Sequence, residues 1–173
     1  MKLHEIAPHR LTHGDIAIIE DWLYQFNIKT GTYKIDPLSG AVAVRGNVCL
    51  DYCQLAQLPL QFEDVSGSFS CQWSDLTSLK GFPRWMAGSL RIRSSQIQSL
   101  HGIEKVIEHV GNTIELNSTT THILGILLIN VGHISIDDGG PIDTIMNRYK
   151  NTGDVISAQD ELIDAGFKDQ ARL

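Results

Sequence analysis

Apolar and glycine positions recur with a fixed period in the middle of the chain. Blocks that begin at Val44, Val65 and Met86 are each 21 residues long and align without gaps. The blocks share a glycine, an apolar-x-apolar pair and two later apolar columns: Gly46, Gly67 and Gly88; Val48/Leu50, Phe69/Cys71 and Leu90/Ile92; Leu55, Leu76 and Ile97; Leu58, Leu79 and Leu100. Because one such unit cannot bury its own apolar side, the pattern predicts stacked coils with a continuous core.

Each coil is expected to contain a short strand around the apolar pair, then a turn and a compact return segment. Looser copies of the pair at Ile114/Leu116 and Ile134/Ile136 extend the series. We therefore expect parallel strands at residues 48–50, 69–71, 90–92, 114–116 and 134–136. The predicted fold class is α/β: a short leucine-rich-repeat-like solenoid with a 21-residue repeat and parallel strands.

The segment before the repeats predicts a helix and a hairpin. Thr12 and Asp15 form a helix start of the S/T-x-x-D/E type, and apolar residues at helical spacing follow to residue 27. Two short strands, at residues 33–35 and 41–44, flank a turn and should cover the first edge of the array.

The segment after the repeats predicts two helices. Pro141 opens the first, which runs to about Lys150, and Gly153 ends it. Asp154 caps the second, which ends at Gly166. We expect a single domain over 1–173, with an N-terminal helical cap (1–32), a repeat solenoid (33–138) and a C-terminal helical cap (139–173).

The repeats also resemble a known group of proteins. The run GAVAVRGNVCLDYCQLAQLPLQFEDVSGSFSCQWSDLTSLKGFPRWMAGSL is similar to the leucine-rich-repeat-like proteins of tailed bacteriophages, whose repeats read approximately V-x-G-x-F-x-C-x-x-N-x-L-T-S-L-x-G-x-P. The match is closest at residues 65–83 and covers about residues 33–116, although the family's asparagine is absent and the repeat decays after Val106. The resemblance implies a phage origin and a solenoid, and it implies no activity.

Composition and charge narrow the classes of partner. Hydrophobic residues make up 42% and charged residues 20% of the chain, which is typical of globular proteins. A formal net charge of −6 has the wrong sign for phosphate contacts, so we expect no direct nucleic acid binding. The longest apolar run, residues 123–129, is too short to cross a bilayer, and the N-terminus lacks the apolar stretch of a secretory signal. We therefore expect no membrane partner and a cytoplasmic location, the host cytoplasm if a phage encodes the protein.

The candidate chemical groups are few. His4, His9 and His13 could ligate a metal ion, but no further ligand lies at a tight spacing, and a solvated segment is the favoured interpretation. The cysteines are expected to be reduced thiols, with Cys71 buried and Cys49 the most reactive. No glycine-rich phosphate loop and no nucleophile motif occurs. We predict no metal site, no cofactor and no enzymatic activity.

The alternation of side chains along the strands predicts a binding surface. With the apolar pairs pointing inward, their neighbours point outward on the concave side. This outward set is Asp51, Tyr52, Gln72, Trp73, Arg91, Arg93, Glu115, Asn117 and Asp137. Tyr, Trp and Arg are enriched in interface hot spots. An alternative is that Tyr52 and Trp73 fold over the turn and are structural.

The leading hypothesis for function is a non-enzymatic protein-interaction module. By analogy with phage accessory proteins, it would bind and inhibit a host protein of the defence or nucleic-acid machinery, one with a basic face. Two alternatives stay open: a virion structural or assembly protein, and a metal-dependent enzyme that uses the N-terminal histidines.

Overall fold

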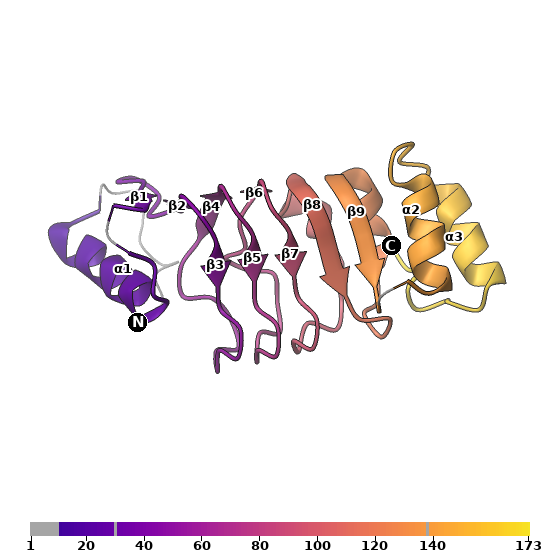
Figure 1. Cartoon of the computed structure of the whole chain (residues 1–173), viewed down its shortest axis with the longest axis horizontal. Coiled ribbons are helices and arrows are strands. Elements are labelled where there is room, and N and C mark those ends of the chain that lie inside the picture. The colour runs from indigo at the N-terminus through magenta and orange to yellow at the C-terminus, as the bar shows by residue number, and fades with distance from the viewer. Residues whose placement is uncertain (1–10, 30, 138) are drawn as a thin grey trace.

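The protein is a solenoid of stacked coils with helices at both ends (Figure 1). The computed structural model describes residues 11–29, 31–137 and 139–173. The elements are α1 (His13–Gln25), β1 (Tyr33–Ile35), β2 (Val42–Val44), β3 (Val48–Cys49), β4 (Phe62–Val65), β5 (Phe69–Ser70), β6 (Trp85–Met86), β7 (Leu90–Arg91), β8 (His109–Leu116), β9 (Asn130–Ile136), α2 (Pro141–Tyr149) and α3 (Val155–Asp164). The predicted fold class, with parallel strands and a repeat of about 21 residues, is confirmed.

Each coil contributes two short strand segments separated by a bend. The segments before the bend, β2, β4, β6 and the first half of β8 and β9, form what we call the first ladder. The segments after the bend, β3, β5, β7 and the second half of β8 and β9, form the second ladder. All of these pairings are parallel, and the two ladders join where β8 runs through the bend without a break.

The second ladder confirms the predicted strand register. Val48 pairs with Phe69, Phe69 with Leu90, Leu90 with Ile114, and Ile114 with Ile134. The first ladder is an addition to the prediction, although its buried column begins with the residues that open the sequence blocks: Val44, Val65, Met86, Val110 and Val131. Of its strands, β2 was predicted as part of the hairpin, whereas β4 and β6 were missed because pieces of two to four residues are too short to show an alternating pattern.

The two ladders and the return segments enclose one apolar core. Phe69 lies in its centre, with ring centroids 5.4 Å from Phe62 and 5.2 Å from Phe82. The two leucine columns of the repeats complete the core: Leu58, Leu76, Leu79, Ile97 and Leu100 are buried, and Leu55 is partly buried against them. In the later coils the return segments form short 3-10 helices, at Ile103–Lys105 and Ile123–Leu128.

Glycines stand at the bend because neighbouring coils touch there through their backbones. A Cβ at Gly111 would lie 2.2 Å from the Ala87 carbonyl oxygen, and one at Gly132 would lie 2.5 Å from the Gly111 carbonyl oxygen. Real Cβ contacts are never that short. From the second coil onward, the glycine at the bend is therefore a steric requirement of coil stacking, whereas a Cβ at Gly46 on the first coil would meet nothing within 4 Å.

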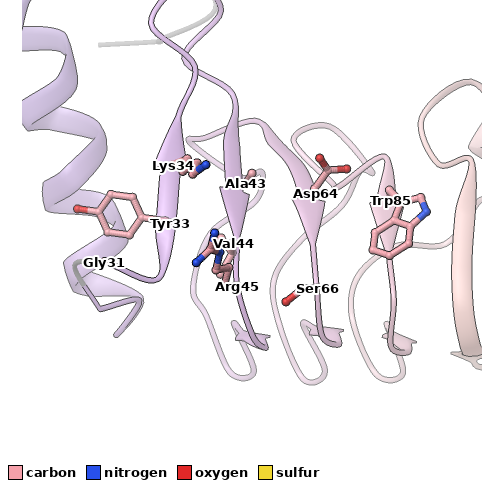
Figure 2. Close-up of a pocket in the computed structure, with 9 residues that line it drawn as sticks. All are labelled: Gly31, Tyr33, Lys34, Ala43, Val44, Arg45, Asp64, Ser66 and Trp85. Atoms are coloured by element: carbon pink, nitrogen blue, oxygen red, sulfur yellow. The ribbon is translucent and has the colours of Figure 1, made fainter.

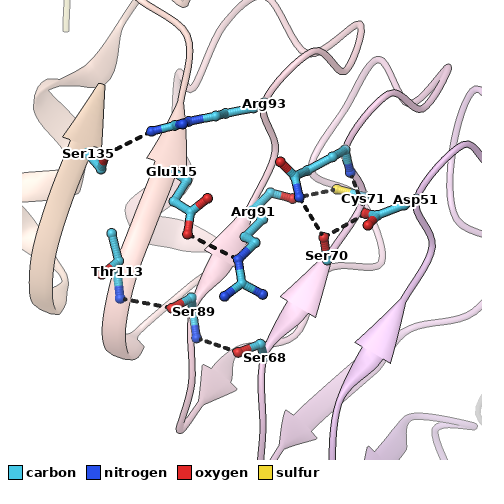
Figure 3. A network of polar contacts seen from close by, with 11 residues as sticks. Asp51, Ser68, Ser70, Cys71, Ser89, Arg91, Arg93, Thr113, Glu115 and Ser135 are labelled. Atoms are coloured by element: carbon cyan, nitrogen blue, oxygen red, sulfur yellow. Dashed lines mark hydrogen bonds and ion pairs between the residues drawn. The ribbon is translucent and has the colours of Figure 1, made fainter. Parts of the chain in front are cut away.

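Side chains beside these glycines hold one bend to the next. Asn47 Oδ1 accepts the Ser68 N–H at 2.8 Å. Ser68 Oγ accepts the Ser89 N–H at 3.0 Å, and Ser89 Oγ accepts the Thr113 N–H at 3.4 Å, as Figure 3 shows. Each bond joins a polar side chain to the backbone one coil further on. The bends thus satisfy backbone donors that strand pairing leaves open.

The N-terminal cap confirms the predicted helix and hairpin. Thr12 and Asp15 form a reciprocal capping box at the start of α1. Ile19 and Leu23 of this helix are buried in the core. β1 pairs antiparallel with β2 and covers the first edge of the first ladder, as expected.

The C-terminal cap covers the last strand with side chains of a helix. Asn147 of α2 accepts the Ile134 N–H at 3.0 Å and donates to the Ile134 carbonyl at 2.6 Å. The buried Asp143 accepts the Ile136 N–H at 3.3 Å. These contacts occupy backbone groups of β9 that would otherwise offer an open strand edge.

We predict that Gly111→Ala destabilises the protein by about 2 kcal/mol or more, because the new methyl group would overlap the Ala87 carbonyl. Urea unfolding followed by circular dichroism measures this loss. The matched control is Gly14→Ala in α1, where the nearest atom lies 3.6 Å away and alanine should stabilise by about 0.5 kcal/mol. Equal unfolding midpoints for the two variants would contradict the steric argument.

Candidate functional site

Two large aromatic residues occupy matching turns of neighbouring coils. Tyr52 follows β3 and Trp73 follows β5, and both have left-handed backbone conformations, with φ of 62° and 55°. Ser94 holds the same position one coil later, with φ of 57°. Left-handed positions favour glycine and asparagine, and bulky residues there are outliers. The chain thus places Tyr52 and Trp73 in a conformation that their side chains do not favour.

The rings of Tyr52 and Trp73 point into solvent. Their exposed fractions are 72% and 60%, so neither ring is packed into the core or under a cap. The backbone beneath them is fixed, because the Tyr52 N–H donates to the Gln72 carbonyl at 2.9 Å and the Trp73 N–H donates to the Arg93 carbonyl at 3.2 Å. Coil stacking therefore sets the two aromatic residues about 4.8 Å apart along the array.

A polar network lies beside the aromatic pair on the second ladder (Figure 3). Asp51 Oδ1 accepts the Ser70 hydroxyl at 2.6 Å and the Gln72 backbone N–H at 2.8 Å. The Gln72 side chain in turn donates to Ser70 Oγ at 3.4 Å. These bonds fix the turn that carries Tyr52 against the coil that carries Trp73.

The arginines of the predicted set also join coils to one another. Arg91 Nε lies 3.0 Å from Glu115 Oε1, and Arg93 Nη2 donates to Ser135 Oγ at 2.8 Å across two coils (Figure 3). Both arginine side chains are half-buried. Their positive charges are therefore committed to contacts within the protein.

The last two predicted residues accept backbone hydrogen bonds. Asn117 Oδ1 accepts the Ser94 N–H at 3.3 Å, and Asp137 Oδ2 accepts the Ser118 N–H at 3.0 Å. The predicted surface thus divides into a polar network that holds the coils in register and an exposed aromatic pair. The binding role of the whole set stays a prediction.

The first ladder carries an exposed aromatic residue, Trp85, that the sequence analysis did not identify. Trp85 is 40% exposed and stacks on His109 of the next coil, with ring centroids 5.1 Å apart and planes inclined by 16°. Trp85 directly precedes the buried Met86, so alternation along the first ladder would have placed it outward.

Of the candidate metal ligands, only His13 falls within the structure. It is the first residue of α1 and is exposed, whereas His4 and His9 lie outside the described residues. In the described part of the chain, no three His, Cys, Asp or Glu side chains gather closely enough to hold a metal ion. The histidine hypothesis stays untested.

The three cysteines are free and differ in exposure, as predicted. Cys49 is exposed, Cys53 is half-buried and Cys71 is buried. Burial raises the pKa of the Cys71 thiol, and the nearby Cys53 and Asp51 add to the increase. Burial is also the main cause of the raised pKa of Cys53.

Comparisons with models of protein families, with curated proteins and with solved structures find no match to this chain. The resemblance to phage repeat proteins therefore remains a hypothesis. Within residues 11–29, 31–137 and 139–173, no helix has both the length and the apolar composition that crossing a bilayer requires.

We predict that iodoacetamide alkylates the native protein in the order Cys49, Cys53, Cys71. The thiolate is the reactive form, and a raised pKa leaves less of it near neutral pH while burial blocks access. Mass spectrometry of the peptides over time measures the three rates. Cys49→Ser should remove the fastest phase alone, and denaturant should make the remaining rates similar. Three equal rates in the native protein would contradict the observed burial.

Proposed function

We propose that this chain is a non-enzymatic protein-binding module whose contact surface centres on Tyr52 and Trp73. The observation that carries the proposal is the aromatic pair itself, which is exposed and held at left-handed turn positions on consecutive coils. Neither property helps the fold: strained backbone conformations cost about 1–3 kcal/mol each, and exposed rings bury no apolar area. A partner that covers the two rings would explain why the chain carries them at these positions.

The chemistry of the pair suits a protein partner. Tyrosine and tryptophan are enriched among interface hot spots, and they lose little conformational entropy on binding. The backbone bonds at Gln72 and Arg93 hold both residues in place before any partner arrives. Such pre-organisation reduces the entropic cost of association.

The ionisable groups support binding rather than catalysis. The shifted carboxyl pKa values belong to groups with structural partners: Asp15 and Asp154 at helix starts, Asp36 in a turn, and Glu108 in an ion pair with Arg84. In each case hydrogen bonds to the charged form lower the pKa, so a structural contact accounts for each shift. The hydrogen bonds that cause these shifts stabilise local structure.

The charge of the chain favours a basic partner. A net charge of −6 attracts a positively charged surface and speeds encounter with it. The resemblance to phage proteins adds a biological setting: an accessory protein that binds and inhibits a host protein of the defence or nucleic-acid machinery. Binding to such a partner should weaken as salt increases.

We predict that the double variant Tyr52→Gly/Trp73→Gly keeps or gains stability while losing its partner. Glycine relieves the left-handed strain, which offsets its extra flexibility in the unfolded state, so the free energy of unfolding should stay within about 1 kcal/mol of wild type or rise. Removal of the hot spots should weaken partner affinity about 30-fold or more. Urea unfolding measures the stability, and capture from lysate followed by titration of the captured protein measures the affinity.

The matched control is Tyr24→Gly on α1, which removes an aromatic ring that is 82% exposed and far from the pair in the sequence. This control should capture the same partner as wild type, although glycine weakens the helix. A double variant that unfolds readily would show that the pair is structural. A double variant that is stable and captures the partner normally would show that the partner does not bind at Tyr52 and Trp73.

A further inference from the structure

The first ladder carries a groove that the proposed function does not use. Figure 2 shows its lining on β1, β2, β4 and β6, and its volume is about 510 Å³. The small Ala43 lies in its floor, between Lys34 on β1 and the strand β4. The pairing of β2 with β4 is irregular here, since Val42 pairs with Phe62 but Val44 pairs with Val65. The extra residue on β4 and the missing side-chain volume at Ala43 together open the groove.

One end of the groove is positively charged. Lys34 and Arg45 both line it and both are exposed. Neither side chain forms a hydrogen bond or an ion pair with any part of the chain that the structure describes. Two unpaired cations on one wall attract a phosphate or carboxylate group, and arginine matches either one with two parallel hydrogen bonds.

The other end of the groove is flat and aromatic. Trp85 lines it, and the parallel order of β4, β6 and β8 places His109 on one side of the indole and Asp64 on the other. Because His109 stacks on the far face, the near face of the indole is left toward the groove (Figure 2). Aromatic faces of this kind stack with nucleobases.

A carboxylate stands next to the indole. Asp64 pairs in register with Trp85, so their side chains project from neighbouring strands on the same face. Asp64 is exposed, and its carboxylate has no hydrogen-bond partner among the residues described. An ionised carboxylate accepts hydrogen bonds only, so it selects a flat group with N–H donors on its edge.

We propose that this groove binds a small anionic ligand with a flat, donor-bearing head, the chemistry of a guanine nucleoside monophosphate. The base stacks on Trp85, its adjacent imino and amino groups donate to Asp64, and the phosphate lies between Lys34 and Arg45. A volume of about 510 Å³ is within the range of ligand pockets. The chain has no glycine-rich phosphate loop, so side chains alone hold the phosphate.

Titration calorimetry with four probes tests both ends of the groove. GMP should bind saturably, whereas guanosine, which lacks the phosphate, and ribose 5-phosphate, which lacks the base, should each bind about tenfold more weakly or worse. AMP should bind more weakly than GMP, because it cannot offer two adjacent donors to one carboxylate.

Three variants assign the contacts. Trp85→Ala and the double variant Lys34→Ala/Arg45→Ala should each weaken GMP binding about tenfold or more. Asp64→Asn should remove the preference for GMP over AMP. The matched control is Trp73→Ala, which deletes an exposed indole on the second ladder and should leave GMP binding unchanged, so a failure of this site is distinct from a failure of the protein-binding surface.

The following results would overturn the proposal. GMP that does not bind at all excludes the site. If ribose 5-phosphate binds as tightly as GMP and Trp85→Ala has no effect, the groove attracts anions in general and has no site for a base. Circular dichroism checks that each variant is folded like wild type. If Trp85→Ala disturbs the fold, Trp85→Phe replaces it: phenylalanine keeps an aromatic face, so this variant should retain most of the affinity for GMP.

Discussion

The backbone of each coil touches the backbone of the next at the bend between the two ladders, where a glycine leaves room for the approach. A methyl group at Gly111 would overlap the Ala87 carbonyl, so the coil spacing and the residue at the bend determine each other. Once the bends are in contact, the strands on both sides fall into register and pair. The Asn47, Ser68 and Ser89 side chains then complete the hydrogen bonds at the bend itself. Strand pairing, core packing and the positions of the turns all depend on this contact.

Much of the fold could be predicted because the constraint repeats. Residues 21 positions apart occupy equivalent places in successive coils and meet the same steric and burial requirements. The glycine and the apolar pairs can therefore be recognised in the sequence alone. The capping box of Thr12 and Asp15 is equally visible, since its two hydrogen bonds are local. Strands β4 and β6 of the first ladder were missed because segments as short as Trp85–Met86 carry no pattern of their own.

The functional surface was only partly predictable, since side-chain contacts depend on how coils of different length stack. Tyr52 and Trp73 are exposed as predicted, but the left-handed turns beyond β3 and β5 cause this rather than strand alternation, which would place both on the face of the buried Leu50 and Cys71. Alternation also could not show that Arg93 reaches Ser135, because that hydrogen bond crosses two coils. The groove over Ala43 depends on an irregular pairing between β2 and β4, and the spacing of apolar residues does not predict that irregularity.

The bend also explains how one small solenoid can present two chemically different surfaces. By turning the chain within each coil, it separates the outward side chains of the first ladder from those of the second. On the second ladder the polar side chains bond to neighbouring coils, and the turns beyond them carry the exposed Tyr52 and Trp73. Lys34 on β1 and Asp64 and Trp85 on the first ladder project around the small Ala43 and make fewer such contacts. A side chain that bonds to a neighbouring coil has little freedom to bind anything else. The side chains that form no such bond are therefore the ones available to ligands and partners.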